Sequence, residues 1–137
     1  MTTIKDVMTR DVKIVSPDQS LRDAAMAMAA HDIGALPVGD HDRLVGLITD
    51  RDIAIKGVAK GKSVDTAVRE VMCEGIKYCF EDEDVVHVAD NMADLGIRRL
   101  PVVDRQKRLV GIVSLSNICH GHDNARNSLL EGVARPH

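Results

Sequence analysis

An internal repeat constrains the fold of this chain more than any other feature of its sequence. The segment from Ile4 to Ile55 recurs, almost position for position, from Val68 to His120. A unit of about sixty residues buries too little surface to be stable alone, so we expect two copies to pack face to face around a shared core. The matched positions include Val7-Met8 with Val71-Met72, Met28 with Met92, Leu36-Pro37-Val38 with Leu100-Pro101-Val102, and Arg43 to Gly46 with Arg108 to Gly111.

The pattern of apolar residues predicts the same elements in each copy: strand, helix, strand, strand, helix, preceded by a short leading helix. This is an α/β (α+β) fold, with repeat 1 over residues 1–62, repeat 2 over 63–122 and a polar tail over 123–137. The second hairpin gains one residue, at about Gln106, which we place in its turn. The predicted strands are 12–15, 35–38 and 43–48, then 76–80, 99–103 and 108–113. The apolar stripes of the first helices are Leu21, Ala24, Ala25 and Met28, and Val85, Val88, Ala89 and Met92. The leading helices are 4–8 and 68–72, and the last helices begin near Asp50 and Leu115.

Composition narrows the classes of function. Tyr78 and Phe80 are the only aromatic residues, and the formal net charge is -3, so the stacking rings and basic faces that bind nucleic acid are missing. The N-terminus does not resemble a signal peptide, and the longest apolar stretch, from Ala24 to Ala30, is too short to cross a bilayer. We therefore expect a cytoplasmic protein that binds neither membranes nor nucleic acid. Three cysteines cannot all pair, so reduced thiols are expected.

Each copy places a hydroxyl and an Asp or Asn three residues apart, where its last strand enters a helix. These residues are Thr49 and Asp52 in the first copy, and Ser114 and Asn117 in the second. A hydroxyl at a helix start lies beside free amides and the positive end of the helix dipole, which favour a phosphate. A carboxylate accepts two hydrogen bonds at once and suits the vicinal hydroxyls of a ribose. The pattern thus predicts a nucleotide site, while a capping box of the same two side chains is the structural alternative.

Four linked segments surround this pattern: Asp6 to Met8, Val15 to Asp18, His31 to Val38 and Arg43 to Asp52. In this order, and duplicated, they resemble a tandem pair of cystathionine-β-synthase (CBS) domains, a Bateman module, from Ile4 to about His120. The chain is similar to small stand-alone pairs of the hypoxic response type. The resemblance implies two sheets that face each other about a pseudo-two-fold axis, and a homodimer that forms a disc of four repeats. It also implies two clefts per chain for adenosine-containing ligands such as AMP, ADP, ATP or S-adenosylmethionine.

The resemblance also implies which residues form the two clefts. Asn117 offers one acceptor oxygen, which weakens recognition of a diol, so we expect the first cleft to be the competent one. Arg98 and Arg99 replace Gly34 and Ala35, and they either reach a phosphate or form a solvated pair. The first cleft would use Thr49 near phosphate, Asp52 on ribose, and Val12, Ile14, Ala35, Leu36 and Pro37 around the base. The second would use Ser114 and Asn117 with Ile76, Tyr78, Arg99, Leu100 and Pro101.

Cys119, His120 and His122 are the densest group of metal-capable side chains. A structural zinc site needs four ligands, so zinc binding would require further ligands such as Cys73 or a partner chain. A helix end that carries histidines is the alternative. No single segment joins a base, a nucleophile and an orienting group, so we assign no catalytic residue and do not expect an enzyme.

These observations predict a non-enzymatic regulatory module of a stress response, which binds an adenosyl ligand and acts on a separate effector protein. Two alternatives stay open. One is a ligand-independent dimeric stress adaptor, in which Thr49 and Asp52 form only a cap. The other is a metal-binding stress protein built around Cys119, His120 and His122.

Overall fold

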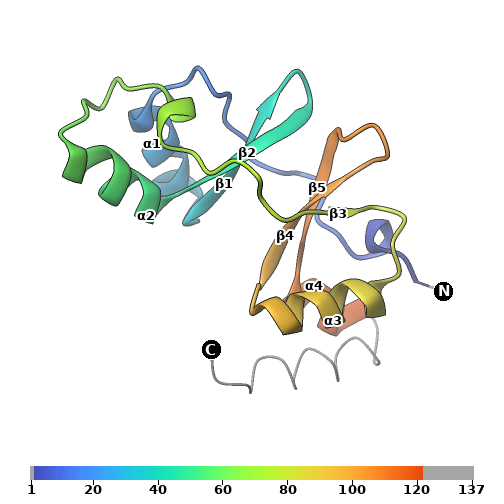
Figure 1. Ribbon diagram of the computed structural model, residues 1–137. Helices are drawn as coiled ribbons and strands as arrows, with labels where there is room; N and C mark the ends of the chain where they lie inside the picture. The colour runs from blue at the N-terminus through green and yellow to red at the C-terminus, as the bar shows by residue number, and fades with distance from the viewer. Residues whose placement is uncertain (1, 122–137) are drawn as a thin grey trace. The chain divides into compact units, whose positions relative to one another are not determined.

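The computed structural model describes residues 2–121, and the predicted polar tail lies outside this range. The chain divides into two compact units. The first-repeat unit is Lys13–Ile76, and the second-repeat unit combines residues 2–12 with 77–121 (Figure 1). Both contain a small sheet and helices, which confirms the predicted mixed α/β class.

The first-repeat unit is built around the antiparallel hairpin β1 (Ala35–Asp40) and β2 (Arg43–Thr49). Helix α1 (Leu21–His31) precedes it and begins with a capping box of Ser20 and Asp23. After β2 the chain continues into α2 (Asp50–Asp52), a π-helical turn η2 (Ile53–Gly57) and a 3₁₀ turn η3 (Val58–Lys60). Leu21, Ala24 and Met28 of α1 are buried as predicted, but Ala25 is exposed, because α1 turns a narrower apolar face to its core.

The second-repeat unit contains a three-stranded sheet in the order β3-β4-β5. Strand β3 (Cys79–Phe80) runs parallel to β4 (Arg99–Val103), and β4 is antiparallel to β5 (Leu109–Ser114). Helices α3 (Val85–Leu95) and α4 (Leu115–Gly121) lie side by side (Figure 1). The predicted stripe of α3 is buried in full, including Ala89 and Met92.

The predicted leading helices exist as 3₁₀ turns, η1 (Ile4–Asp6) and η4 (Val68–Glu70), and each packs on the core of the other repeat. Ile4 and Met8 lie in the core of the second-repeat unit, whereas Val68 and Val71 lie in the core of the first-repeat unit. Backbone hydrogen bonds hold both segments in place, for example from Ile4 N to Glu83 O at 2.9 Å and from Val68 N to Gln19 O at 2.7 Å. Each compact unit therefore consists of one repeat completed by the leading segment of the other.

The hairpins match the prediction closely, and the strands that precede the helices do not. Gly39 pairs with Leu44 in the first hairpin and Val103 with Leu109 in the second, so the extra residue lies in the turn as predicted. The predicted strand over 12–15 is wrong, because only Val15 forms a bridge, to Val38. The predicted strand over 76–80 shortens to Cys79 and Phe80. Ile14, which precedes Val15, is 45% exposed and takes part in none of the bridges found within residues 2–121.

Candidate functional site

The residues predicted to bind phosphate and ribose in the first copy form a reciprocal capping box. The Thr49 hydroxyl accepts a hydrogen bond from Asp52 N at 3.0 Å, and Asp52 Oδ2 accepts one from Thr49 N at 3.0 Å. The Asp50 amide donates to Gly34 O at 2.9 Å. A Cβ atom at Gly34 would lie 3.0 Å from Asp50 Oδ2, so a larger residue there would require the Asp50 side chain to shift. The box is therefore present in the structure, and the ribose contact of Asp52 stays a prediction.

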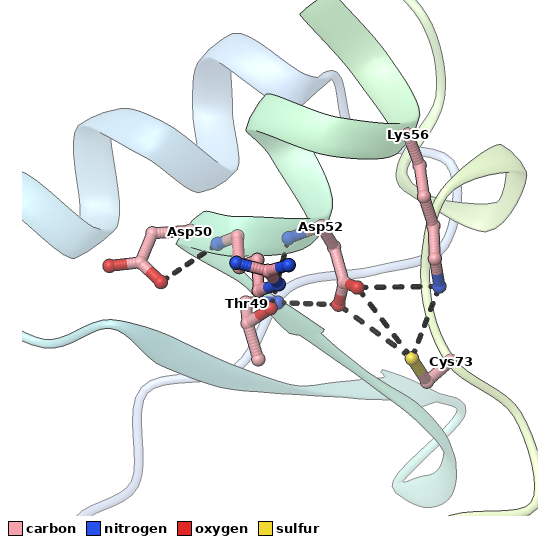
Figure 2. Close-up of polar contacts among 6 residues, drawn as sticks. Thr49, Asp50, Asp52, Lys56 and Cys73 are labelled. Carbon is pink, nitrogen blue, oxygen red and sulfur yellow. Dashed lines mark hydrogen bonds and ion pairs between the residues drawn. The ribbon is translucent and has the colours of Figure 1, made fainter. Parts of the chain in front are cut away.

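A lysine and a cysteine complete the site around the Asp52 carboxylate. Lys56 Nζ lies 3.3 Å from Asp52 Oδ1 and 3.3 Å from Cys73 Sγ. Cys73 Sγ lies 3.7 and 3.8 Å from the two oxygens of Asp52. Figure 2 shows the three groups converging on one point beside the start of α2. Asp52 is only 9% exposed, and it is the one buried charged residue among the described residues.

The surroundings of this carboxylate hold it in its charged form. Burial raises the pKa of Asp52, but hydrogen bonds from Thr49 and the contact with Lys56 lower it by more, so the pKa of Asp52 lies below its ordinary value. Hydrogen bonds to Cys73 and then to Asp52 raise the pKa of Lys56. The cluster therefore carries a permanent carboxylate and a permanent ammonium near neutral pH.

Replacing Asp52 with Asn should reduce the dependence of stability on acidity. A carboxylate with a lowered folded pKa stabilises the fold at pH values above its unfolded pKa, near 3.8, and loses that effect as the pH falls through its folded pKa. At pH 7 we expect the free energy of unfolding of wild type to exceed that of Asp52→Asn by roughly 0.5 kcal/mol. The difference is small because solvent screens the ion pair with Lys56. Urea unfolding between pH 7 and pH 3 should show this difference shrinking toward zero.

The matched control for this experiment is Asp23→Asn in the capping box of α1. Within residues 2–121 no cation forms an ion pair with Asp23, and its carboxylate accepts from Ser20 N at 3.5 Å. Asp23→Asn should therefore change the pH dependence of the free energy of unfolding less than Asp52→Asn does. If Asp52→Asn lowers the free energy of unfolding by the same amount at pH 7 and pH 3, the charge of Asp52 does not stabilise the fold.

The second copy repeats the box with an amide. Asn117 Oδ1 accepts from Ser114 N at 3.0 Å and from Ser114 Oγ at 2.9 Å, while Asn117 N donates to Ser114 Oγ at 3.1 Å. The single amide oxygen is thus already used twice. Arg98 and Arg99 are both exposed, and the Arg98 carbonyl accepts from Leu115 N at 3.0 Å. The structure therefore preserves the cap in both copies and the carboxylate in one.

The other predicted cleft residues differ in their exposure. Strand register places Ala35 opposite Thr49 and Arg99 opposite Ser114, so these pairs are neighbours. Leu36 is fully buried in the core, whereas Ile14 is 45% exposed. The remaining predicted residues fall into three groups: Pro37, Leu100 and Pro101 are buried, Val12 and Ile76 are half-buried, and Ala35 and Tyr78 are exposed.

A pocket in the second-repeat unit includes Tyr78 and Leu100 of the predicted second cleft, but not Ser114 or Asn117. It is a cavity of about 160 Å³ between α3 and the chain that leads into β3. Tyr78 packs edge-on against Phe80, with ring centroids 5.8 Å apart, and Lys107 Nζ lies 5.4 Å from the Tyr78 ring centre. The pocket is lined by Lys77, Tyr78, Cys79, Glu83, Val88, Asn91, Met92, Leu95 and Leu100.

Two residues of the site, Lys56 and Cys73, were not predicted from sequence as neighbours of Asp52. Lys56 lies one helical turn after Asp52, a spacing that signals contact. Cys73 is distant in sequence from both and carries no such signal.

No group of three metal-capable side chains is found among the described residues. The predicted metal ligands lie outside them, because the side chains of Cys119 and His120 and all of His122 are not described.

The sequence comparisons identify the family. The family model for the CBS domain matches residues 4–57 and 68–121. The chain therefore belongs to the CBS domain family and contains two such domains in tandem. It is 39% identical to hypoxic response protein 1 of Mycobacterium tuberculosis over 139 residues, covering 99% of this chain and 96% of that one. It is also 38% identical to an inosine-5'-monophosphate dehydrogenase of Methanocaldococcus jannaschii, of which it covers only 22%.

Solved structures show the same fold. Hypoxic response protein I with two coordinated zinc ions has a TM-score of 0.77 at 40% identity, covering 88% of this chain and 99% of that one. CBSX2 in complex with AMP has a TM-score of 0.77 at 26% identity, covering 88% and 96%. The CBS domain pair of MJ0100 with 5-methylthioadenosine and S-adenosyl-L-methionine has a TM-score of 0.69 at 35% identity, covering 88% and 94%. None of the helices described here has the length and apolar character needed to span a membrane.

Proposed function

We propose that this protein is a non-enzymatic, cytoplasmic regulatory module that binds an adenosyl ligand at the start of α2. The observation that carries the proposal is the buried Asp52 carboxylate, held in the first repeat of a CBS pair whose solved relatives contain AMP or S-adenosylmethionine. In this proposal Asp52 accepts the ribose hydroxyls and the Thr49 hydroxyl lies near phosphate. A role in a stress response is supported by similarity to hypoxic response protein 1.

Lys56 favours a ligand that carries phosphate. Its side chain is 45% exposed and its ammonium lies 3.3 Å from Asp52 Oδ1, next to the atom proposed to accept from ribose. An ammonium in this place can contact a phosphate without leaving the carboxylate unpaired. AMP, ADP and ATP are therefore preferred over S-adenosylmethionine, whose sulfonium would lie near a like charge.

Calorimetric titration of the full chain with AMP, ADP, ATP and S-adenosylmethionine tests this function. We expect AMP to bind with a Kd below about 1 mM, and Asp52→Ala to weaken it about tenfold, the effect of losing one charge-assisted hydrogen-bond pair. Asn117→Ala should leave the affinity for AMP unchanged. Absence of binding by all four ligands, or equal affinity of wild type and Asp52→Ala, would refute the assignment.

The capping geometry favours one alternative function. Because Thr49 and Asp52 already satisfy each other's amides, they are sufficient as a structural cap without any ligand. In this case the protein would be a ligand-independent dimeric stress adaptor. The same titration separates the two, since an adaptor would bind none of the ligands while remaining folded.

We also propose that the module forms a homodimer, a disc of four repeats, and acts on a separate effector protein. Met26, Val58 and Leu95 are large apolar residues that are 58%, 69% and 55% exposed, and the proposal predicts that dimerisation buries side chains of this kind. Zinc binding through Cys119, His120 and His122 remains a third proposal, supported by the two zinc ions of the hypoxic response protein structure. Native mass spectrometry of the purified protein would report both the number of chains and any retained zinc.

A further inference from the structure

Backbone hydrogen bonds hold Cys73 beside the carboxylate of the candidate site. Its amide donates to Leu47 O at 2.8 Å, and its carbonyl accepts from Leu47 N at 3.0 Å, so it pairs with the middle of β2. This approach needs the glycine next to Leu47, because a Cβ atom at Gly46 would lie 2.8 Å from the Cys73 carbonyl oxygen. These contacts thus fix the backbone of Cys73 at a place from which its side chain reaches Asp52 and Lys56.

The two described cysteines differ in burial and in whether a cation lies beside them. Cys73 is half-buried, and its thiol donates to the oxygens of Asp52 at 3.7 and 3.8 Å. Lys56 Nζ lies closer to the sulfur, at 3.3 Å, where an ammonium can donate a hydrogen bond to a thiolate. Cys79 is 3% exposed, and burial followed by the charge of Glu83 raises the pKa of Cys79 to about 12. Since the thiolate is the reactive form of cysteine, Cys79 should be inert near neutral pH, while Cys73 combines solvent access with a neighbouring cation.

The described part of the second-repeat unit lacks this cluster, although its backbone is arranged in the same way. Thr9 occupies the position of Cys73 and pairs with Ile112 through hydrogen bonds of 2.8 and 2.9 Å. The repeat alignment places Asn117 at the position of Asp52, and Gly121 at that of Lys56. Strand pairing and helix capping therefore require neither a thiol nor a lysine, so folding alone does not explain why Cys73, Lys56 and Asp52 occur together.

We propose that Cys73 is a modification site for small hydroperoxides and that its oxidation weakens the binding of a nucleotide at Asp52. In the reaction the thiolate sulfur attacks one oxygen of hydrogen peroxide, so that an S–O bond forms and the O–O bond breaks. Sulfur loses two electrons to the peroxide, and the leaving hydroxide becomes water by taking a proton from solvent. The balanced outcome is that a thiol and hydrogen peroxide give a sulfenic acid and water.

The added oxygen acts on the charges of the cluster. It must enter a space in which sulfur, ammonium and carboxylate are separated by only 3.3 to 3.8 Å, so it competes with Asp52 Oδ1 for Lys56. A carboxylate deprived of its ammonium, or an ammonium drawn away from the phosphate, lowers affinity for a nucleotide. This second part of the proposal rests on the proposed function of Asp52, whereas the first part does not.

The first test maps oxidation by mass spectrometry after hydrogen peroxide and dimedone, which traps sulfenic acid, are added to the full chain at neutral pH. We expect Cys73 to be labelled at least about tenfold faster than Cys79. Lys56→Met should slow the labelling of Cys73 at least about threefold, while Lys56→Arg and the matched control Lys60→Met should not. Equal rates for Cys73 and Cys79 in wild type, or an unchanged Cys73 rate in Lys56→Met, would overturn the modification site.

Cys79 also reports whether each variant is folded, because unfolding would expose it and raise its labelling. Should Lys56→Met raise the labelling of Cys79, the comparison of Lys56→Gln with Lys56→Arg takes its place. In that pair the neutral amide introduced by K56Q should slow Cys73 labelling, and the cation retained in K56R should preserve it. Equal Cys73 rates in K56Q and K56R would overturn the role of the cation.

The second test titrates AMP into reduced and peroxide-treated protein. We expect oxidation to weaken AMP binding to wild type at least about threefold. In Cys73→Thr, which carries the residue found at the equivalent position Thr9, peroxide treatment should leave the affinity for AMP unchanged. Equal affinity of oxidised and reduced wild type would overturn the coupling. Labelling of Cys73 without binding of AMP, ADP, ATP or S-adenosylmethionine to either form would leave the modification site standing and refute the proposed nucleotide function.

Discussion

Replacing Gly46 with alanine should lower the free energy of unfolding by roughly 2–3 kcal/mol, the cost of overpacking a tight contact. The new Cβ atom would lie 2.8 Å from the Cys73 carbonyl oxygen and 3.0 Å from Met72 Sδ. A backbone oxygen cannot move aside as a flexible side chain can, so the segment of Met72 and Cys73 must shift from β2. The two hydrogen bonds between Leu47 and Cys73 would then lengthen or break.

Gly39→Ala is the matched control, because Gly39 lies opposite Leu44 in the same hairpin. Its added Cβ atom would meet the flexible end of Ile14, at 3.3 Å, so the change in stability should stay within about 1 kcal/mol. Urea unfolding followed by circular dichroism measures both variants. Equal stability of Gly46→Ala and Gly39→Ala would show that the close approach of Cys73 to β2 is not needed.

Replacing Ile48 with alanine should be still more costly, at about 3 kcal/mol, because a buried isoleucine leaves a cavity when it is truncated. Ile48 is fully buried and lies in the core of the first-repeat unit with Leu36 and Val38. It also directly precedes Thr49, so its loss should loosen the start of α2. Thermal and urea unfolding should both report the change.

The control for this variant lies on the same strand. Val45 faces the other side of β2 and is 37% exposed, so Val45→Ala should cost less than about 1 kcal/mol. The contrast tests the alternation of buried and exposed residues along β2. A cost for Val45→Ala as large as that for Ile48→Ala would contradict the packing of this strand.

Much of the fold could be predicted because the repeat presents each pattern twice. The hairpins follow from alternation and turn residues, and their register places the inserted residue where the offset changes. The exchange of leading segments could not be predicted, because Ile4 and Val68 have the same apolar character and their local sequence does not indicate which core each one joins. Chain connectivity and tertiary packing, rather than local preference, decide which core each segment joins.

Part of the site could also be predicted from the repeat, which presents the capping pattern twice. The hydroxyl and the carboxylate are spaced as in a capping box, and both copies form one. Lys56 follows Asp52 by one helical turn, so its contact could have been predicted. Cys73 reaches the site through pairing with β2, a contact between distant segments that no local spacing reveals.

The exchange of leading segments bears on how such a chain arose. A single repeat that kept this arrangement would complete its core with the leading segment of a second molecule, each providing its segment to the other. Fusing two repeats places both segments in one chain, where a high effective concentration replaces association between molecules. Gene duplication would thus have kept the architecture of a swapped dimer while making its stability independent of protein concentration.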